Sequence, residues 1–177
     1  MEAQIIETRT IYDRWTKFRE AAVRLPNGVI EKRVIEDHGG AVAVLLYDPE
    51  RLTALLVTQP RAPVLWAGEE PLLEVVAGGL DGKTAEETVR AEAMEEAGVS
   101  VSLMRHVATV WPMPGVSTEK IALYLAEYSM ADRIGSGGGA DDENECIELI
   151  EVPLIDLWRR LKSGTLTDGK HSRSSRH

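Results

Sequence analysis

The sequence of 177 residues is poor in several residue types, and each scarcity excludes a class of protein. Its single cysteine, Cys146, excludes an internal disulfide and suits a reducing compartment. No apolar run reaches the roughly 20 residues that a membrane-spanning helix needs. Basic residues number 20 against 29 acidic ones, and the net charge of -9 disfavours nucleic acid or an anionic membrane as the main partner. The stretch MEAQIIETRT also lacks the regions of a signal peptide, so we expect a cytoplasmic protein.

The residues that are present have the pattern of a globular domain with many strands and few helices. Hydrophobic residues make up 44% of the chain and charged residues 28%. The apolar and β-branched runs predict strands over residues 15–25, 28–37, 39–48, 52–59, 99–111, 121–128 and 146–152. Asn27-Gly28 between the first two runs predicts a tight hairpin. Helices are expected over 84–97, closed by Gly98, and over 153–164. This order favours an α+β fold, with a mixed β-sheet sandwiched between the helices.

The first of these helices carries three glutamates, Glu92, Glu95 and Glu96, at the spacing that brings side chains onto one helical face. The plain interpretation is a solvated acidic face. Against it, no lysine is interleaved, and like charges at this spacing destabilise a helix. Arg90 is expected to point away and to pair with Glu86. A divalent cation would neutralise such a cluster, and hard oxygen ligands favour Mg²⁺, or Mn²⁺, over Zn²⁺.

The helix follows a glycine-rich loop, and the two together resemble a known motif. Glycines let the backbone approach a ligand closely, and a metal held by the carboxylates would bridge them to diphosphate oxygens. The segment AGGLDGKTAEETVRAEAMEEAGV, residues 77–99, resembles the Nudix box of hydrolases that cleave a nucleoside diphosphate linked to another group. It departs from the box in three ways. The loop after Gly78 is one residue shorter than in the usual box. Lys83 or Thr84 stands near the position where the box has its first glutamate, and Ala91 stands where the box has an arginine.

The resemblance covers most of residues 5–170, over which the sequence is similar to the branch of Nudix hydrolases that acts on nucleotide sugars. Its further motifs are DHGGAVAVLLYDPE, QPRAPV, LLEVVAGGLD, PMPGVSTEKIALYLAEY, GGGADDENECIELIEVPL and LKSGTLTDGK. The shortened box and the TDGK ending are closer to the members that act on GDP-mannose than to those that act on ADP-ribose. The expected division is an N-terminal β-hairpin extension over 1–37, a Nudix hydrolase domain over 38–165 and a C-terminal tail over 166–177. The resemblance also implies a homodimer in which such extensions are exchanged.

The resemblance assigns candidate metal ligands and a candidate base. It implies that the Ala77 carbonyl, Glu92 and Glu96 hold Mg²⁺, with Glu95 as an additional or water-mediated ligand and Glu96 also counted as catalytic. Relatives take a general base from the acidic loop after the second glycine run, where Glu145 matches best and Glu143 second. The alternative is that DDENE is only a solvated linker. Glycines 137–139 would let this loop close over substrate.

Other side chains are weaker candidates for the substrate site. Arg61 is expected to bind the phosphates or the sugar, and Glu74 to support the glycine loop or reach a metal-bound water. Glu119 is expected to orient substrate or a metal-bound water, although turn formation alone would explain the Pro-Gly loop around it. Trp66 and Trp111 are candidates for stacking on a base, with a core position as the alternative. His38 and His106 are expected to be structural, and no partner for either is evident from the sequence.

The sequence therefore predicts a Mg²⁺-dependent enzyme that converts GDP-mannose into GMP and mannose 1-phosphate. The first alternative is ADP-ribose as substrate, giving AMP and ribose 5-phosphate. The second is a protein that binds nucleotide sugars with little catalysis, which the altered box would suit. Neither nucleic acid nor a membrane is expected as a partner.

Overall fold

The computed structural model describes residues 2–139 and 146–165. The strands are β1 (Gln4–Asp13), β2 (Lys17–Arg24), β3 (Ile30–Asp37), β4 (Ala41–Asp48), β5 (Thr53–Thr58), β6 (Val76–Gly79), β7 (Met104–Val110), β8 (Ile121–Glu127) and β9 (Glu148–Pro153). The helices are α1 (Ala62–Trp66), α2 (Ala85–Ala97), a 3-10 turn at Met130–Asp132, and α3 (Leu154–Ser163). None of the described helices is long and apolar enough to cross a membrane.

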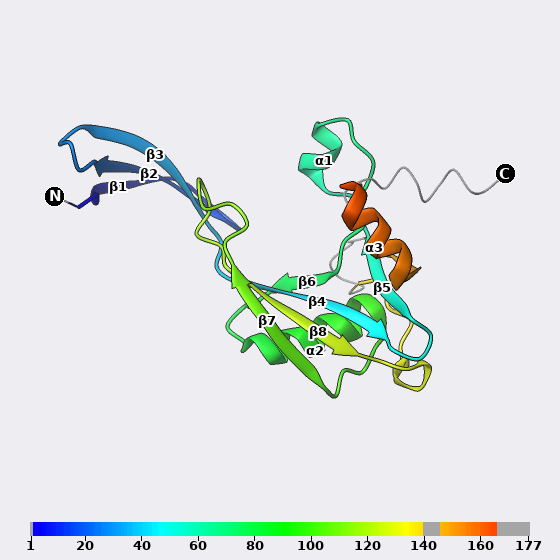
Figure 1. Cartoon of the computed structure of the whole chain (residues 1–177). Helices are drawn as coiled ribbons and strands as arrows, with labels where there is room; N and C mark the ends of the chain where they lie inside the picture. Colours follow the sequence, from blue (N-terminus) through cyan, green and yellow to red (C-terminus); the bar gives the residue numbers. More distant parts are fainter. Residues whose placement is uncertain (1, 140–145, 166–177) are drawn as a thin grey trace.

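The main sheet contains both parallel and antiparallel pairs. Five of its strands lie in the order β7-β8-β4-β5-β9, and β6 pairs with the first half of β4. Strand β4 runs parallel to β8 and antiparallel to β5 and β6. Helices α2 and α3 lie on opposite sides of this sheet (Figure 1). The predicted α+β architecture with a mixed sheet between helices is confirmed.

Alternation along β4 assigns one face of the sheet to each helix. Val42, Val44 and Leu46 are almost fully buried and join the α2 side chains Val89 and Ala93 in the core. Residues between them in the strand point to the opposite face, because side chains alternate along a strand. The core therefore sits between α2 and the sheet, and it holds α2 rigidly against β4, β5 and β6.

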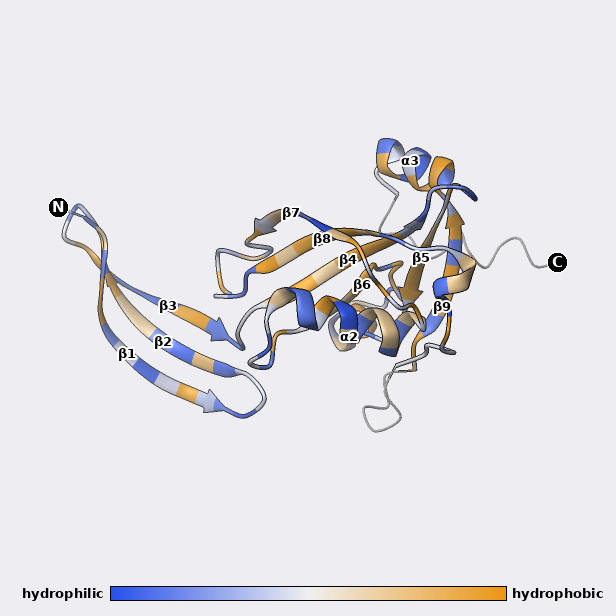
Figure 2. Cartoon of the chain, turned by 90° about the horizontal axis from the view of Figure 1, so that it is seen from below, coloured by the Kyte–Doolittle hydropathy of each residue, from blue (hydrophilic) through white to orange (hydrophobic). Residues whose placement is uncertain are grey.

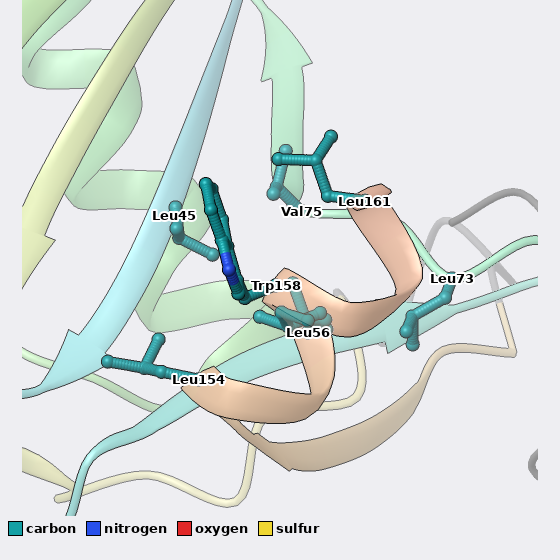
Figure 3. Close-up of a pocket in the computed structure, with 8 residues that line it drawn as sticks. Leu45, Leu56, Leu73, Val75, Leu154, Trp158 and Leu161 are labelled. Carbon is teal, nitrogen blue, oxygen red and sulfur yellow. The ribbon is translucent and has the colours of Figure 1, made fainter. Parts of the chain in front are cut away.

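The other face, under α3, is packed more loosely. Leu154, Leu157, Trp158 and Leu161 recur at helical spacing and turn toward the sheet, where they line a cavity of about 320 Å³ (Figure 3). The sheet side of this cavity is lined by Leu45, Leu56, Leu73 and Val75. Apart from the indole N–H of Trp158, these side chains are apolar. The cavity therefore offers little to a diphosphate, and the candidate site lies elsewhere.

The N-terminal extension is a separate antiparallel sheet of three strands in the order β1-β2-β3. The hairpin at Asn27-Gly28 forms as predicted between β2 and β3, with Gly28 at a φ of 84°. The sequence did not single out β1, so the extension has one strand more than a hairpin. This sheet stands away from the rest of the chain as an arm (Figures 1 and 2). All of β1 is exposed, including the apolar side chains Ile5 and Ile11.

Candidate active site

Strand β6 and helix α2 bring a glutamate directly against the backbone of the glycine loop. A Cβ on Gly78 would lie 2.0 Å from Glu92 Oε1 and 2.2 Å from Glu92 Cδ. A side chain at 78 would displace the Glu92 carboxylate from this position, so glycine at 78 is what lets the carboxylate lie against the loop. The sequence predicted that this loop would let the backbone approach a ligand, and the structure adds that Glu92 lies directly beside Gly78.

Glu96 is only 2% exposed, although it carries a carboxylate. The backbone N–H of Ala77 donates to Glu96 Oε2 at 3.3 Å. A carboxylate is rarely buried to this degree unless a partner compensates for the lost hydration. The interpretation of this helical face as merely solvated is therefore wrong for Glu96, which points into the protein beside the loop.

The local structure of α2 explains why these two glutamates reach the loop. Thr84 caps the helix and forms a capping box with Glu87, which fixes the first turn. Gly98 ends the helix in the left-handed conformation with a φ of 67°. Glu92 and Glu96 are one turn apart, and the buried Ala93 beside them holds this side of the helix against the sheet.

Glu95 differs from its two neighbours, because its side chain is exposed. Across residues 2–139 and 146–165, no group of three His, Cys, Asp or Glu side chains gathers closely enough to hold a metal ion. The three glutamates therefore do not form a closed cage of carboxylates. The donors near the loop still fit a hard cation, because Mg²⁺ is usually bound by one or two carboxylates together with substrate phosphates and water.

The glycines that precede the acidic loop pack on the C-terminal end of α2. Gly138 and Gly139 donate their N–H groups to the carbonyls of Glu96 and Glu95, at 2.9 and 3.1 Å. A Cβ on Gly137 would lie 2.5 Å from the Glu96 carbonyl oxygen. These glycines therefore allow close packing on the helix end. The base candidates Glu143 and Glu145 lie outside the described residues.

Arg61 and Glu74 form an ion pair where the chain approaches the glycine loop. The guanidinium donates to the Glu74 carboxylate with Nη2–Oε2 at 2.9 Å and Nε–Oε1 at 3.2 Å. Glu74 is itself fixed by two backbone hydrogen bonds with Val57 on β5. The structure thus brings together two residues that the sequence proposed separately, and the carboxylate orients the guanidinium.

Glu119 lies in a hydrogen-bonded cluster where the arm joins the main sheet. His38 Nε2 lies 3.1 Å from Glu119 Oε1, and His38 Nδ1 contacts Glu36 Oε1. The hydroxyls of Ser117 and Thr16 also donate to Glu36, each at 2.5 Å. His38 therefore has two carboxylate partners that the sequence analysis did not identify, Glu36 two residues away and Glu119 81 residues away along the chain.

The cluster changes the protonation of its members. Burial alone would lower the pKa of His38, but hydrogen bonds to Glu36 and Glu119 and their charges outweigh it, so the pKa is raised. Burial would raise the pKa of Glu36, but hydrogen bonds from Ser117, Thr16 and His38 outweigh it and hold the pKa below its usual value. Both shifts favour the charged forms.

Three further expectations were wrong or incomplete. Arg90 does not pair with Glu86 in the way expected, because its guanidinium donates to the carbonyls of Val101 and Ser102 beyond the helix. Neither tryptophan candidate is in the core. Trp66 is 93% exposed at the end of α1, and Trp111 is half exposed with the Lys120 ammonium 5.0 Å from its ring centre. His106 contacts the Thr109 hydroxyl and the Tyr124 ring.

Comparisons with known proteins agree on one family. The model of the NUDIX domain matches residues 37–172. A protein of Citrobacter koseri named GDP-mannose pyrophosphatase is 35% identical over 172 residues, which cover 94% of this chain and 89% of that protein. A protein of the same name from Klebsiella pneumoniae is 34% identical over 176 residues, covering 96% and 88%. The crystal structure of an ADP compounds hydrolase matches with a TM-score of 0.72 over 92% of this chain and 84% of that one, at 16% identity.

Proposed function

The chain belongs to the NUDIX domain family and is a hydrolase of diphosphate bonds, and from this premise we propose that its substrate is GDP-mannose. The reaction adds water across the diphosphate of a nucleoside diphosphate sugar. The water oxygen bonds to one phosphorus as the bridging P–O bond breaks, and the products are GMP and mannose 1-phosphate.

The choice of substrate is supported by the relatives rather than by a pocket. Those named GDP-mannose pyrophosphatase align along almost the whole chain, from the arm to α3. The structural neighbour titled ADP compounds hydrolase is too distant in sequence to carry more than the fold. ADP-ribose is therefore kept as the competing substrate in the test below.

The observation that carries the proposed chemistry is the meeting of α2 with the glycine loop. Glu92 lies against Gly78, and Glu96 is buried with the Ala77 N–H as a donor. Carboxylates held at a loop without side chains leave room for diphosphate oxygens beside them. A helix that only needed solubility would place these glutamates in solvent instead.

NUDIX hydrolases generally need a divalent metal ion, and we propose Mg²⁺, which Mn²⁺ can replace. Glu92, Glu96 and the Ala77 carbonyl are the proposed ligands, with Glu95 as an additional or water-mediated one. When bound, the cation supplies charge neutralisation for the diphosphate and lowers the pKa of a water molecule. The chain itself fixes the carboxylates, because α2 is capped at both ends and packed into the core.

We propose roles for the remaining groups toward water and substrate. Glu145, with Glu143 as second candidate, takes the proton of the attacking water as general base. Arg61, oriented by Glu74, binds the phosphates or the sugar, and Glu119 orients the substrate. This distribution gives an acidic protein its necessary local cation at the phosphates.

We further propose that two copies assemble through the arm, in a cytoplasmic homodimer. The arm presents apolar side chains that are about half exposed, among them Ile5, Ile30 and Val34. A three-stranded sheet with exposed apolar groups gains stability when a second copy packs on it. The single cysteine suits the reducing environment of the cytoplasm.

Chromatography of the products tests the substrate. GDP-mannose and ADP-ribose are offered separately, with Mg²⁺ and with a chelator, to the protein and to its Glu92→Gln variant. We expect GMP and mannose 1-phosphate in the presence of Mg²⁺, and at least tenfold less product from the variant. AMP formed from ADP-ribose, with no product from GDP-mannose, would identify ADP-ribose as the substrate. Tight binding of a nucleotide sugar without turnover would show that the chain is a binding protein and not an enzyme.

A further inference from the structure

His38 occupies the junction between the arm and the main sheet, and its ring touches both. On the arm side it contacts Glu36 at the end of β3, and the Trp15 ring lies 5.6 Å away between β1 and β2. On the other side it reaches Glu119, in the loop that leads into β8. The junction is reinforced by backbone hydrogen bonds from Glu36 N–H to the Val116 carbonyl and from Thr118 N–H to the Glu36 carbonyl, at 2.8 and 2.9 Å.

The contacts determine how many protons the ring carries. An ionised carboxylate can only accept hydrogen bonds, and a neutral imidazole has only one N–H to donate. Glu36 accepts from two hydroxyls, one at each carboxylate oxygen, and its lowered pKa favours the ionised form. With carboxylate oxygens at both nitrogens, the ring satisfies both contacts only as the doubly protonated imidazolium. The raised pKa of His38 agrees with this geometry.

Other charged groups near the junction have partners of their own. Asp37, next to Glu36, accepts from the Thr118 hydroxyl at 2.9 Å and pairs with Arg19 at 3.9 Å. The Lys120 ammonium lies over the Trp111 ring. The charges that face the His38 ring directly are therefore the two carboxylates, Glu36 from β3 and Glu119 from the loop.

The sheet places this junction beside the candidate active site. In β4, Ala41 pairs with Gly79 of the glycine loop on one side and with Ile121 of β8 on the other. The Gly40 carbonyl accepts from the Leu80 N–H, and the Ala41 N–H donates to the Lys120 carbonyl, both at 3.0 Å. His38 and Glu119 are three and two residues before the paired Ala41 and Ile121. Because a chain spans at most about 3.3–3.6 Å per residue, His38 and Glu119 lie within roughly 11 Å of these paired residues, which lie beside the glycine loop.

We propose that His38 is a positioning residue, whose imidazolium fixes the Glu119 carboxylate at the edge of the site by tying it to Glu36 and the arm. The proposal rests on the proposed function for its effect on substrate, but not for the protonation and the contact. A fixed carboxylate binds substrate hydroxyls without first losing side-chain freedom. When the ring loses a proton, it can donate to only one of the two carboxylates. Glu36 keeps its two hydroxyl donors, so the loss of the histidine donor frees the Glu119 side chain more than that of Glu36.

The direction of the pH effect follows from this arrangement. A histidine with a raised pKa contributes its contacts fully below its ordinary value of about 6.5, and the contribution is lost as the pH rises through the folded-state pKa. The KM for GDP-mannose should therefore rise about tenfold across that pH, the size expected for one hydrogen bond to a charged group. The kcat should change less than about twofold if Glu119 contributes only to binding.

The test combines nitrogen and proton NMR titration with kinetics. The protein is compared with its His38→Gln and Glu119→Gln variants and with His106→Gln, a matched control on β7 outside the candidate site. We expect both His38 nitrogens to carry protons below the titration midpoint, and this midpoint to lie above 6.5 and to fall in Glu119→Gln. In His38→Gln the KM should be high at every pH, while His106→Gln should keep the wild-type profile.

Two results would overturn the proposal. The first is a His38 titration midpoint at or below 6.5, or a midpoint that Glu119→Gln leaves unchanged. The second is a KM profile in His38→Gln that still rises as in the wild type. A protein that turns over no nucleotide sugar would refute the proposed function, and the NMR titration would still decide between a bridging imidazolium and an uncoupled histidine.

Discussion

Replacing Gly78 with alanine tests whether the Glu92 carboxylate must lie against the loop. The new Cβ would stand 2.0 Å from Glu92 Oε1, whereas ordinary van der Waals contacts of a Cβ begin at 3.4 Å. The carboxylate must therefore move by about 1 Å or more, and a displacement of this size in a catalytic group lowers the rate on the order of 10²-fold. We expect kcat/KM for GDP-mannose with Mg²⁺ to fall by that factor in Gly78→Ala.

The stability of this variant should change little. Gly78 is not in the left-handed region, so alanine introduces no backbone strain. The clashing atoms belong to a glutamate side chain that can rotate, and alanine restricts the unfolded chain, which stabilises by about 0.4–1 kcal/mol. The Tm should stay within roughly 3 °C of the wild type.

The neighbouring glycine supplies a matched control. A Cβ on Gly79 would meet only Asp81, at 3.6 Å or more, and Gly79 also lacks a positive φ. Gly79→Ala should therefore keep activity within about threefold of the wild type. Equal activities of the two variants, measured under the same Mg²⁺ concentration, would refute the view that contact between Glu92 and the loop is needed.

Three further outcomes are expected. Glu96→Gln keeps the shape of the buried side chain and an acceptor for the Ala77 N–H but removes the charge. Turnover should therefore fall about 10²-fold or more, while the circular dichroism spectrum stays native. Full activity would show that Glu96 is not a catalytic residue. Gly98→Ala places a Cβ 2.3 Å from the Gly135 carbonyl oxygen at a φ of 67°, and should lower the free energy of unfolding by about 2 kcal/mol and the Tm by roughly 4–8 °C. The control Gly164→Ala has a similar φ of 72° but meets nothing within 4 Å, so it should lose less stability. Equal losses in calorimetry would contradict the packing argument. Light scattering over a range of concentrations should give twice the chain mass, and a strict monomer would remove the homodimer.

Local signals explain most of what the sequence predicted correctly. The boundaries of α2 agree within one residue, because Thr84 with Glu87 and the closing Gly98 are start and stop signals that act within a turn. The strands of the main sheet were found because their apolar runs are long and bounded by turns. The association of Glu92 and Glu96 with the glycine loop came from the resemblance to the Nudix box, and their function remains a proposal.

Long-range contacts explain what was missed. The partners of His38 and Arg90 lie beyond their own elements, and the link from His38 to Glu119 exists only after β4 and β8 pair. Strand β1 escaped detection because two register shifts in its pairing with β2 interrupt the alternation of its side chains. Helix α1 has five residues, too few for a helical period to show, and its exposed Trp66 goes against the usual burial of tryptophan.

Hydrolysis of GDP-mannose in water enriched in oxygen-18 tests the central claim most directly. Phosphorus NMR and mass spectrometry would follow the protein with Mg²⁺, the same protein with a chelator, and the Glu96→Gln variant. We predict Mg²⁺-dependent GMP and mannose 1-phosphate, with one heavy oxygen incorporated per diphosphate cleaved, and little product in the other two samples. Cleavage that survives the chelator and Glu96→Gln, or products without heavy oxygen, would contradict hydrolysis by the carboxylates of α2 at the glycine loop.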